Sequence, residues 1–168
     1  MSTLIGTRTA AVPAVARAST VHLYWPAVDD GEVDTRPLLQ TLRGRGVTVV
    51  LPVVTSYDPA APEMEHRRFE GRSCLSTNRW GLREPSGTPR VAPETFDAVI
   101  VPALGADRRG TRLGRGGGYY DAFLRDCTAP SLLPTYEACL VDALPSAPHD
   151  VPVTTIVTER DVVLPDSS

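Results

Sequence analysis

A glycine-rich stretch in the second half of the chain carries the residues best suited to chemistry. Residues 112–121 read Arg-Leu-Gly-Arg-Gly-Gly-Gly-Tyr-Tyr-Asp. Glycines let successive backbone N–H groups turn towards one anion, and a helix that follows them adds its positive N-terminal end. Arg112 and Arg115 supply forked donors that match phosphate oxygens. The stretch predicts a phosphate-binding loop, and the competing interpretation is a mobile glycine-rich turn without function.

The common nucleotide-binding motifs do not extend this prediction. A Walker loop requires Gly-Lys-Ser/Thr, and the sequence contains no lysine. A dinucleotide fold places Gly-x-Gly-x-x-Gly near its first strand, whereas this loop lies far from the first expected strand. The absence of lysine also excludes every reaction step that depends on a lysine side chain.

The first half of the chain predicts a strand, a helix and a second strand. Val21–Trp25 alternates and is rich in β-forming residues, and a proline ends it. Thr35, with a proline two residues later, begins a helix whose leucines follow at helical spacing, and Gly44 ends it. The continuous β-branched run Val47–Leu51 is typical of a strand covered on both faces. Together these elements form a βαβ unit.

Later segments extend the same pattern. Phe96–Pro102 predicts a further buried strand, and the glycine-rich stretch lies between this strand and a helix that begins near Tyr119. Such a position between strand and helix suits a ligand-binding loop. The remaining strand candidates are Leu132–Tyr136, Thr154–Thr158 and Val162–Leu164.

Two segments lack a regular pattern. Residues 55–93 are polar and interrupted by prolines, with edge strands expected near His66–Phe69 and Ser73–Ser76, and form an insertion suited to holding a ligand. Residues 1–20 show neither helical nor strand period, and we expect a loose N-terminal arm. We predict a single α/β domain over residues 21–168, with a mostly parallel central sheet, helices on both faces and ligands at the carboxyl ends of the strands.

Composition limits the partners of the protein. A chain of 168 residues fits one domain, since typical domains hold roughly 100–200 residues. The net charge is −3 at pH 7 and the basic residues are scattered, so we expect no nucleic-acid partner. No apolar run approaches the roughly 18–20 residues that cross a bilayer, which predicts no membrane partner and a cytoplasmic location. We also expect a monomer.

The run Arg112–Asp121, followed by Phe123-Leu124, is similar to the most distinctive motif of the 5-formyltetrahydrofolate cyclo-ligases, also called methenyltetrahydrofolate synthetases. Four other segments agree in the family's order and cover the chain from about residue 21 to its end. The resemblance implies an enzyme that uses ATP and Mg²⁺ to convert a reduced folate, 5-formyltetrahydrofolate, into 5,10-methenyltetrahydrofolate, with release of ADP and phosphate. The four segments are Leu23–Pro26 with Gly31–Thr35, Leu51–Val54, Trp80–Pro85, and His149–Pro152 with Val157–Glu159.

The resemblance assigns nucleotide and metal roles residue by residue. Arg115 and Tyr120 are the implied catalytic residues. Asp121 and Asp150 resemble the carboxylates that hold magnesium, a hard ion that prefers oxygen ligands. The family's nucleotide loop falls on Arg112, Leu113, Gly114, Arg115, Gly116, Gly117, Gly118, Tyr119 and Tyr120.

The resemblance also implies a folate pocket beside the loop. Glu32 corresponds to the glutamate that faces the pterin, where a carboxylate accepts two hydrogen bonds from an amino-pyrimidine edge. Trp80 falls where the family places an aromatic side chain near the folate rings, and an indole stacks well on a flat heterocycle. Tyr119 and Tyr120 would line the same cleft through their hydroxyl groups. One of the two tyrosines 119 and 120 is expected to be core packing, because consecutive residues at a helix start point in different directions.

Structural interpretations of the same residues stay open. Asp121 suits the first turn of a helix, where the dipole stabilises a carboxylate. Asp150 follows a proline-containing segment and suits a turn. Glu32 after Asp-Asp-Gly suits a solvated turn, and Trp80 between arginine and glycine suits a partly buried core position.

The sequence departs from the family at nucleotide and pocket positions. The family's helical arm, with its lysine and arginine, has no match before Val21, where Arg8 and Arg17 are the candidates to replace it. Ala106 stands where the family has phenylalanine, and Cys139 where it has glutamine. Two explanations stay open, a start downstream of the true one or a divergent paralogue. Because arm cations would offset charge on the moving phosphate, we expect slow turnover.

Two other functions compete with the enzyme. A paralogue that keeps the loop but lacks the arm cations would bind folate or nucleotide without catalysis. A sugar-phosphate isomerase or acyl-transfer relative would need a positioned acid–base pair, for which Glu32 and His149 are the candidates.

Overall fold

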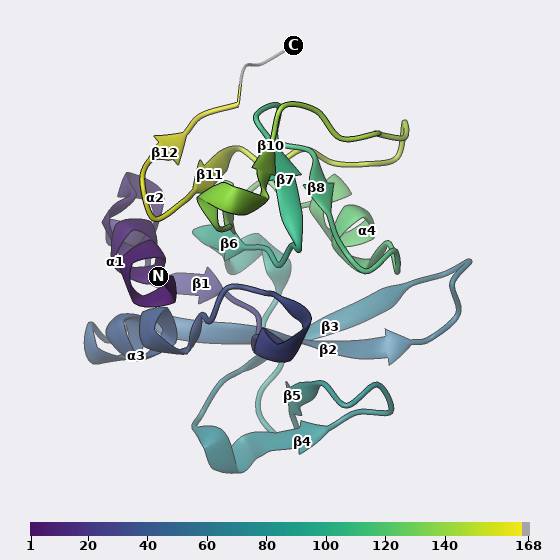
Figure 1. Ribbon diagram of the computed structural model, residues 1–168. Coiled ribbons are helices and arrows are strands. Elements are labelled where there is room, and N and C mark those ends of the chain that lie inside the picture. Colours follow the sequence, from purple (N-terminus) through teal and green to yellow (C-terminus); the bar gives the residue numbers. More distant parts are fainter. Residues whose placement is uncertain (166–168) are drawn as a thin grey trace.

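Short runs of aliphatic and β-branched residues form a seven-stranded central sheet. The computed structural model describes residues 1–165, and Figure 1 shows their arrangement. Neighbouring strands are parallel from β11 to β2, while β12 and β3 add an antiparallel strand at each edge. The prediction of a mostly parallel sheet is confirmed. In sheet order the strands are β12 (Val162–Val163), β11 (Thr155–Val157), β9 (Ser131–Pro134), β6 (Ala98–Ile100), β1 (Thr20–His22), β2 (Thr48–Ser56) and β3 (Glu63–Arg68).

The sheet separates two hydrophobic clusters, because successive side chains of a strand point to opposite faces. In β2, Leu51 packs with the residues of helices α1 (Ser2–Ala11) and α3 (Arg36–Gly44). Its neighbour Val50 packs in the other cluster, with helix α4 (Tyr119–Arg125). Helices therefore cover both faces, as the sequence predicts (Figure 1).

The N-terminal residues correct the prediction of a loose arm. Residues 2–16 form α1 and a short helix α2 (Pro13–Ala16), and Ile5 and Val15 are buried in the core. Gly6 allows α1 to approach α3 closely, since a Cβ there would lie 3.5 Å from the Cβ of Leu38. Apart from Ile5, the buried residues of α1 are Gly6, Thr9 and Ala10, so the segment lacks the periodic large side chains that reveal a helix in the sequence.

Helix α3 begins and ends where the sequence predicts. Thr35 is its N-cap residue, and the backbone after Arg45 turns at Gly46, whose φ is 79°. The Thr35 side chain donates its hydroxyl to the carbonyl of Tyr24 instead of capping the helix. The side chain of Asp34 instead satisfies a free N–H at the start of the helix, because its Oδ1 accepts the backbone N–H of Arg36 at 3.0 Å.

Smaller elements surround the carboxyl ends of the parallel strands. Strand β2 continues beyond the expected run and forms a long hairpin with β3. A second hairpin follows the buried strand β6 and separates it from the glycine-rich stretch. None of the described helices is long and apolar enough to span a membrane. The smaller elements are β4 (Leu75–Thr77), β5 (Arg83–Pro85), β7 (Gly105–Asp107), β8 (Arg112–Leu113), β10 (Leu140–Val141) and the 3₁₀ turns η1 (Val28–Asp30), η2 (Arg72–Cys74), η3 (Pro93–Thr95) and η4 (Glu137–Cys139).

Candidate functional site

The glycine-rich stretch connects β8 to α4. Gly116 and Gly118 have φ values of 79° and 69°, a conformation that favours glycine. Gly117 has no room for a side chain, because a Cβ there would lie 2.8 Å from the ring of Tyr119. At Gly116 no described atom lies within 4 Å of a built Cβ, so this part of the loop faces open space. The loop therefore presents backbone that a ligand can approach closely.

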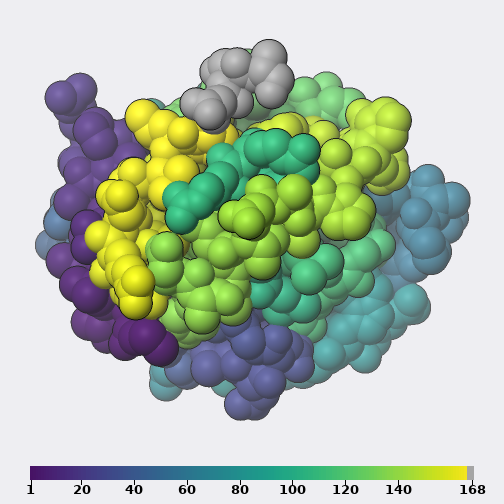
Figure 2. All heavy atoms as spheres, turned by 45° about the horizontal axis from the view of Figure 1, so that its top comes forward, coloured from purple at the N-terminus to yellow at the C-terminus, as the bar shows by residue number. Residues whose placement is uncertain are grey.

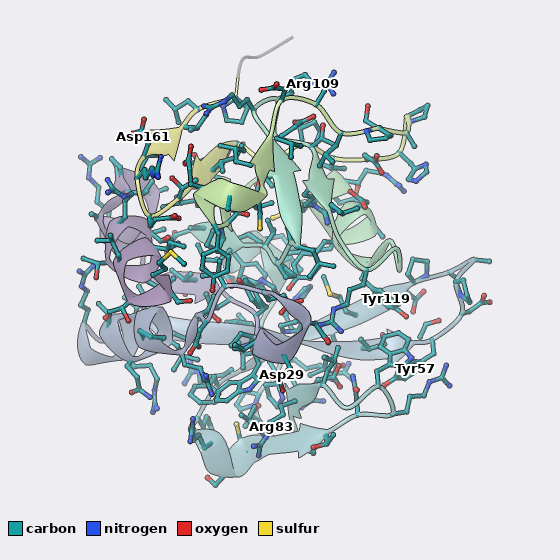
Figure 3. The ribbon with its side chains drawn as sticks, in the orientation of Figure 1. Asp29, Tyr57, Arg83, Arg109, Tyr119 and Asp161 are labelled. Carbon is teal, nitrogen blue, oxygen red and sulfur yellow. The ribbon has the colours of Figure 1, made fainter. Side chains whose placement is uncertain are left out.

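Asp107 holds the hairpin that leads into this loop. Its carboxylate is fully buried and accepts the backbone N–H groups of Arg109, Thr111 and Leu144 at 2.9, 3.0 and 2.9 Å. The Arg109 guanidinium, labelled in Figure 3, also bonds it. These contacts join the β7–β8 hairpin to the segment after β10, and Figure 2 shows the two segments side by side. Burial by itself would raise the pKa of Asp107. The hydrogen bonds from Leu144 and the other donors outweigh burial and keep the pKa of Asp107 below its usual value. The hairpin is therefore fixed from two sides.

Arg112 and Asp121 face each other across the glycine-rich stretch. Nη2 of Arg112 lies 2.5 Å from Oδ1 of Asp121, and both side chains are largely buried. The same oxygen accepts the backbone N–H of Val151 at 3.0 Å. The Nε of Arg112 is sealed from solvent and has no hydrogen-bond partner in the part of the chain that the structure describes. Arg112 therefore retains a donor that an incoming acceptor could use after a small rearrangement.

Asp150 directly precedes Val151, whose backbone N–H bonds the carboxylate of Asp121. Its Oδ2 accepts the backbone N–H of Ala147 at 2.7 Å, and the side chain is half-buried. Because Asp121 bonds the residue after Asp150, the two carboxylates sit on adjoining segments. Oδ2 of Asp121 accepts no hydrogen bond from the described residues. The described residues contain no cluster of three or more His, Cys, Asp or Glu side chains suited to a metal ion.

A magnesium ion fits this pair only with additional oxygen ligands. Such ions are commonly held by one or two carboxylates together with phosphate oxygens and water. Asp121 and Asp150 would supply the carboxylates, and the glycine-rich stretch lies directly before Asp121. The donor set therefore matches magnesium bound together with a phosphorylated ligand.

Arg115 extends from the glycine-rich stretch to the η1 turn. Its Nη2 lies 2.6 Å from Oδ2 of Asp30, and its Nε lies 3.4 Å from Oε1 of Glu32. Glu32 is 7 % exposed, and its Oε2 accepts the backbone N–H of Ala27 at 2.8 Å. Burial raises the pKa of Glu32, while the Ala27 hydrogen bond and the Arg115 guanidinium oppose this rise. Glu32 is thus a buried carboxylate, and the interpretation of a solvated turn acid is wrong.

Aromatic side chains from three segments meet beside the loop. The Trp80 ring lies at the β4–β5 turn, with its centroid 4.5 Å from that of Tyr57 and 5.7 Å from that of Tyr119. The Tyr119 hydroxyl donates to the carbonyl of Ser56 at 2.7 Å (Figure 3). Trp80 is 47 % exposed, which rules out the core interpretation of this residue. The guanidinium of Arg79 lies 3.9 Å from the Tyr57 ring centroid.

Tyr120 points into the core. Its hydroxyl is sealed from solvent, has no hydrogen-bond partner among the described residues, and its pKa is raised far above the usual value by burial. Its ring lies 6.0 Å from that of His22, a fully buried residue. Tyr120 is therefore the core-packing member of the tyrosine pair, because the helix start turns consecutive side chains in different directions. The catalytic role expected for Tyr120 stays a prediction.

Known proteins are similar to this chain in sequence and in fold. A family model described as the 5-formyltetrahydrofolate cyclo-ligase family matches residues 2–159. The chain belongs to this family. It is 34 % identical over 161 residues to the 5-formyltetrahydrofolate cyclo-ligase of Escherichia coli K12, covering 93 % of this chain and 86 % of that protein. The Mycolicibacterium smegmatis 5-formyltetrahydrofolate cyclo-ligase is 35 % identical over 147 residues, or 84 % of this chain and 74 % of that protein.

Solved structures carry the same fold. The Aquifex aeolicus 5,10-methenyltetrahydrofolate synthetase superposes with a TM-score of 0.83 at 30 % identity, covering 99 % of this chain and 82 % of that chain. A Mycoplasma pneumoniae 5,10-methenyltetrahydrofolate synthetase gives a TM-score of 0.71 at 24 % identity over 94 % and 84 % of the two chains, which supports the fold alone. The resemblance stated from the motifs is therefore confirmed.

Within this cyclo-ligase fold, the expected residues form two adjoining groups. Arg112, Asp121 and the neighbourhood of Asp150 lie on one side of the loop, and Arg115 with Glu32 on the other. Leu113, which lies between Arg112 and Arg115 in the sequence, is 53 % exposed. Four further residues shape these groups and were not singled out from the sequence: Asp30, Tyr57, Arg79 and Asp107. A signal existed for Asp107, since an Asp at the first and a Gly at the fourth position of a turn, here Asp107 and Gly110, predict a side chain that bonds nearby backbone N–H groups.

Proposed function

We propose that this protein converts 5-formyltetrahydrofolate into 5,10-methenyltetrahydrofolate, using ATP and Mg²⁺ and releasing ADP and phosphate. The observation that carries the proposal is the contact between Arg115 of the glycine-rich loop and buried Glu32. This contact brings a phosphate-binding cation next to a carboxylate suited to a pterin. The family membership supplies the reaction.

The nucleotide phosphates would lie along the glycine-rich loop. The space that a side chain would fill at Gly116 is open, and the guanidinium groups of Arg112 and Arg115 flank the loop. Asp121 and Asp150 would hold a magnesium ion, which would offset phosphate charge. To bind phosphate, Arg112 could use its unpartnered Nε after a small rearrangement, while Nη2 keeps its contact with Asp121.

The reduced folate would bind on the other side of Arg115. Glu32 would accept hydrogen bonds from the amino-pyrimidine edge, a role for which a buried carboxylate is well suited because few water molecules compete. Trp80, Tyr57 and Tyr119 form an aromatic surface against which flat rings can pack. The two ligands would then meet at the loop.

The chemistry requires positioning and charge neutralisation. The formyl oxygen attacks the γ-phosphorus and displaces ADP, the tenth nitrogen of the folate then attacks the formyl carbon, and loss of phosphate and of the nitrogen-bound proton gives the methenyl ring. The protein holds the formyl oxygen in line with the γ-phosphate and stabilises the phosphate charge with Arg112 and Arg115. This scheme assigns no step to Tyr120, whose hydroxyl is sealed from solvent.

Formation of the methenyl product, followed by its absorbance, tests the proposal. We expect product only when 5-formyltetrahydrofolate, ATP and Mg²⁺ are all present, with one ADP formed per product. Binding of folate and ADP by calorimetry without product in the complete mixture would instead identify a non-catalytic binding protein. That the protein acts as a cytoplasmic monomer, without nucleic-acid or membrane partners, stays a prediction.

A further inference from the structure

Arg115 is held more closely by Asp30 than by Glu32. The contact to Asp30 measures 2.6 Å and the contact to Glu32 measures 3.4 Å. Asp30 ends the η1 turn and is followed by Gly31, whose φ of 96° requires glycine. The side chain of Asp30 is 56 % exposed, and that of Arg115 is 39 % exposed. An exposed acid therefore sets the position of the loop arginine.

The two acids lie nearest to two different nitrogens of the guanidinium. Nε is the nitrogen closest to Glu32, and Nη2 is the one closest to Asp30. A guanidinium carries five N–H donors in a fixed fork, so two contacts leave donors unused. Among the described residues no ion pair or hydrogen bond is found for Nη1 of Arg115. Nη1 is therefore the nitrogen best placed to donate to a phosphate.

We infer that Asp30 is a positioning residue for the nucleotide, acting through Arg115. It holds the guanidinium through Nη2 and so leaves Nη1 to face the phosphates. This inference rests on the proposed function, in which Arg115 contacts the nucleotide and Glu32 contacts the folate. When Glu32 turns its oxygens to the folate, Asp30 keeps Arg115 in place. Asp30 thus lets one arginine serve the nucleotide while the adjoining folate pocket is filled.

A charge argument makes the opposite prediction, which sharpens the test. Removing a negative charge close to a polyanionic ligand should tighten binding by reducing repulsion. Removing a positioning group should weaken binding, because Arg115 must then be ordered by the ligand itself. Asp29 provides the matched control, since it lies in the same exposed turn and has no ion pair among the described contacts (Figure 3).

The experiment measures binding of ADP with Mg²⁺ by calorimetry. We expect Arg115→Ala to weaken binding by about tenfold or more, and Asp30→Asn by about threefold to tenfold. Asp29→Asn should bind as wild type or slightly tighter. The double variant Asp30→Asn/Arg115→Ala should bind no more weakly than Arg115→Ala alone, because the two residues act as one unit. Asp30→Glu, which keeps the carboxylate, should recover part of the loss.

The outcomes separate the inference from the proposed function. Wild-type affinity in Arg115→Ala would remove the nucleotide role of the loop arginine and the inference with it. Weakened binding in Arg115→Ala with equal or tighter binding in Asp30→Asn would overturn the positioning role alone. An Asp30→Asn loss that persists undiminished in the Arg115→Ala background would also overturn it, since Asp30 would then act independently of Arg115.

Discussion

Nη2 of Arg112 lies 2.5 Å from Oδ1 of Asp121, so the residues at the two ends of the glycine-rich stretch are tied together. The pair is largely buried, and the backbone of Val151 adds a second donor to the same oxygen. This contact fixes the span of the loop between β8 and α4. It also offsets the charge of both groups before any ligand arrives.

Replacing Arg112 should reduce stability as well as nucleotide binding. Arg112→Ala leaves the carboxylate of Asp121 without its cation, and we expect the free energy of unfolding to fall by about 2 kcal/mol, less than for a fully buried pair. Affinity for ADP should fall as well. Urea unfolding and calorimetry measure the two effects. Arg112→Lys, which keeps the charge but not the fork, should lose less stability, and an Arg112→Ala protein equal to wild type in both assays would contradict the assignment.

Asp121 and Asp150 should determine the magnesium requirement. We expect Asp121→Asn or Asp150→Asn to raise the Mg²⁺ concentration for half-maximal turnover by at least about tenfold, because each removes a charged oxygen ligand. Titrating Mg²⁺ at fixed ATP measures this. Asp126→Asn, an exposed acid at the end of α4, is the control. Lower melting temperatures in both variants with an unchanged Mg²⁺ titration would favour a structural role instead.

Buried histidines should make the fold sensitive to acid. Burial lowers the pKa of His66 from 6.5 to about 4 and that of His22 well below 6.5. At a pH between the folded-state pKa and 6.5, the unfolded chain binds more protons than the folded one. The free energy of unfolding therefore falls as the pH decreases from 7 towards 4, and the contribution of the neutral histidines is fully present above about pH 7. For His66 the shift corresponds to about 3 kcal/mol.

Urea unfolding at several pH values between 7.5 and 4 tests this effect. We expect His66→Phe, which places a ring among Phe96 and Phe123, to lose less stability on acidification than wild type. His149→Asn, at an exposed position, should keep the wild-type slope. The same slope in His66→Phe as in wild type would show that His66 does not cause the acid sensitivity.

Gly110 should be among the least replaceable glycines. Its φ is 89°, and a Cβ there would lie 2.7 Å from the carbonyl oxygen of Val153. We expect Gly110→Ala to lower the free energy of unfolding by at least about 2 kcal/mol through backbone strain and steric overlap. Gly87, with φ 73° and no atom within 4 Å of a Cβ, isolates the strain alone. Gly87→Ala should cost about 1 kcal/mol, and an equal cost at both sites would remove the steric contribution.

Continuous β-branched runs made the sheet predictable. Val47–Leu51 and Phe96–Pro102 contain β2 and β6 residues because buried parallel strands require such runs. The helices in residues 2–16 were not predicted, because apart from Ile5 the buried residues of α1 are the small Gly6, Thr9 and Ala10. The slow turnover expected from the sequence stays a prediction, and Arg8 of α1 donates to the carbonyl of Glu159.

Only the parts of the candidate site that lie within one segment of the sequence were predictable. The glycine-rich stretch is one segment, so its residue types indicate a phosphate loop directly. The Asp30–Arg115 contact joins distant segments, and no local pattern predicts which acid an arginine meets. Tyr119 and Tyr120 are adjacent, yet one faces the aromatic surface and the other the core. That choice depends on where the helix begins.

The position of Trp80 gives the protein its own optical reporter. The chain has two tryptophans, and Trp25 packs against Phe69 in a different cluster. Trp80 contacts Tyr57 and Tyr119 and is partly exposed, so its fluorescence depends on what lies against the aromatic surface. In a Trp25→Phe background, all indole emission would come from this one ring. Quenching by acrylamide would then report occupancy of the folate side without an attached dye.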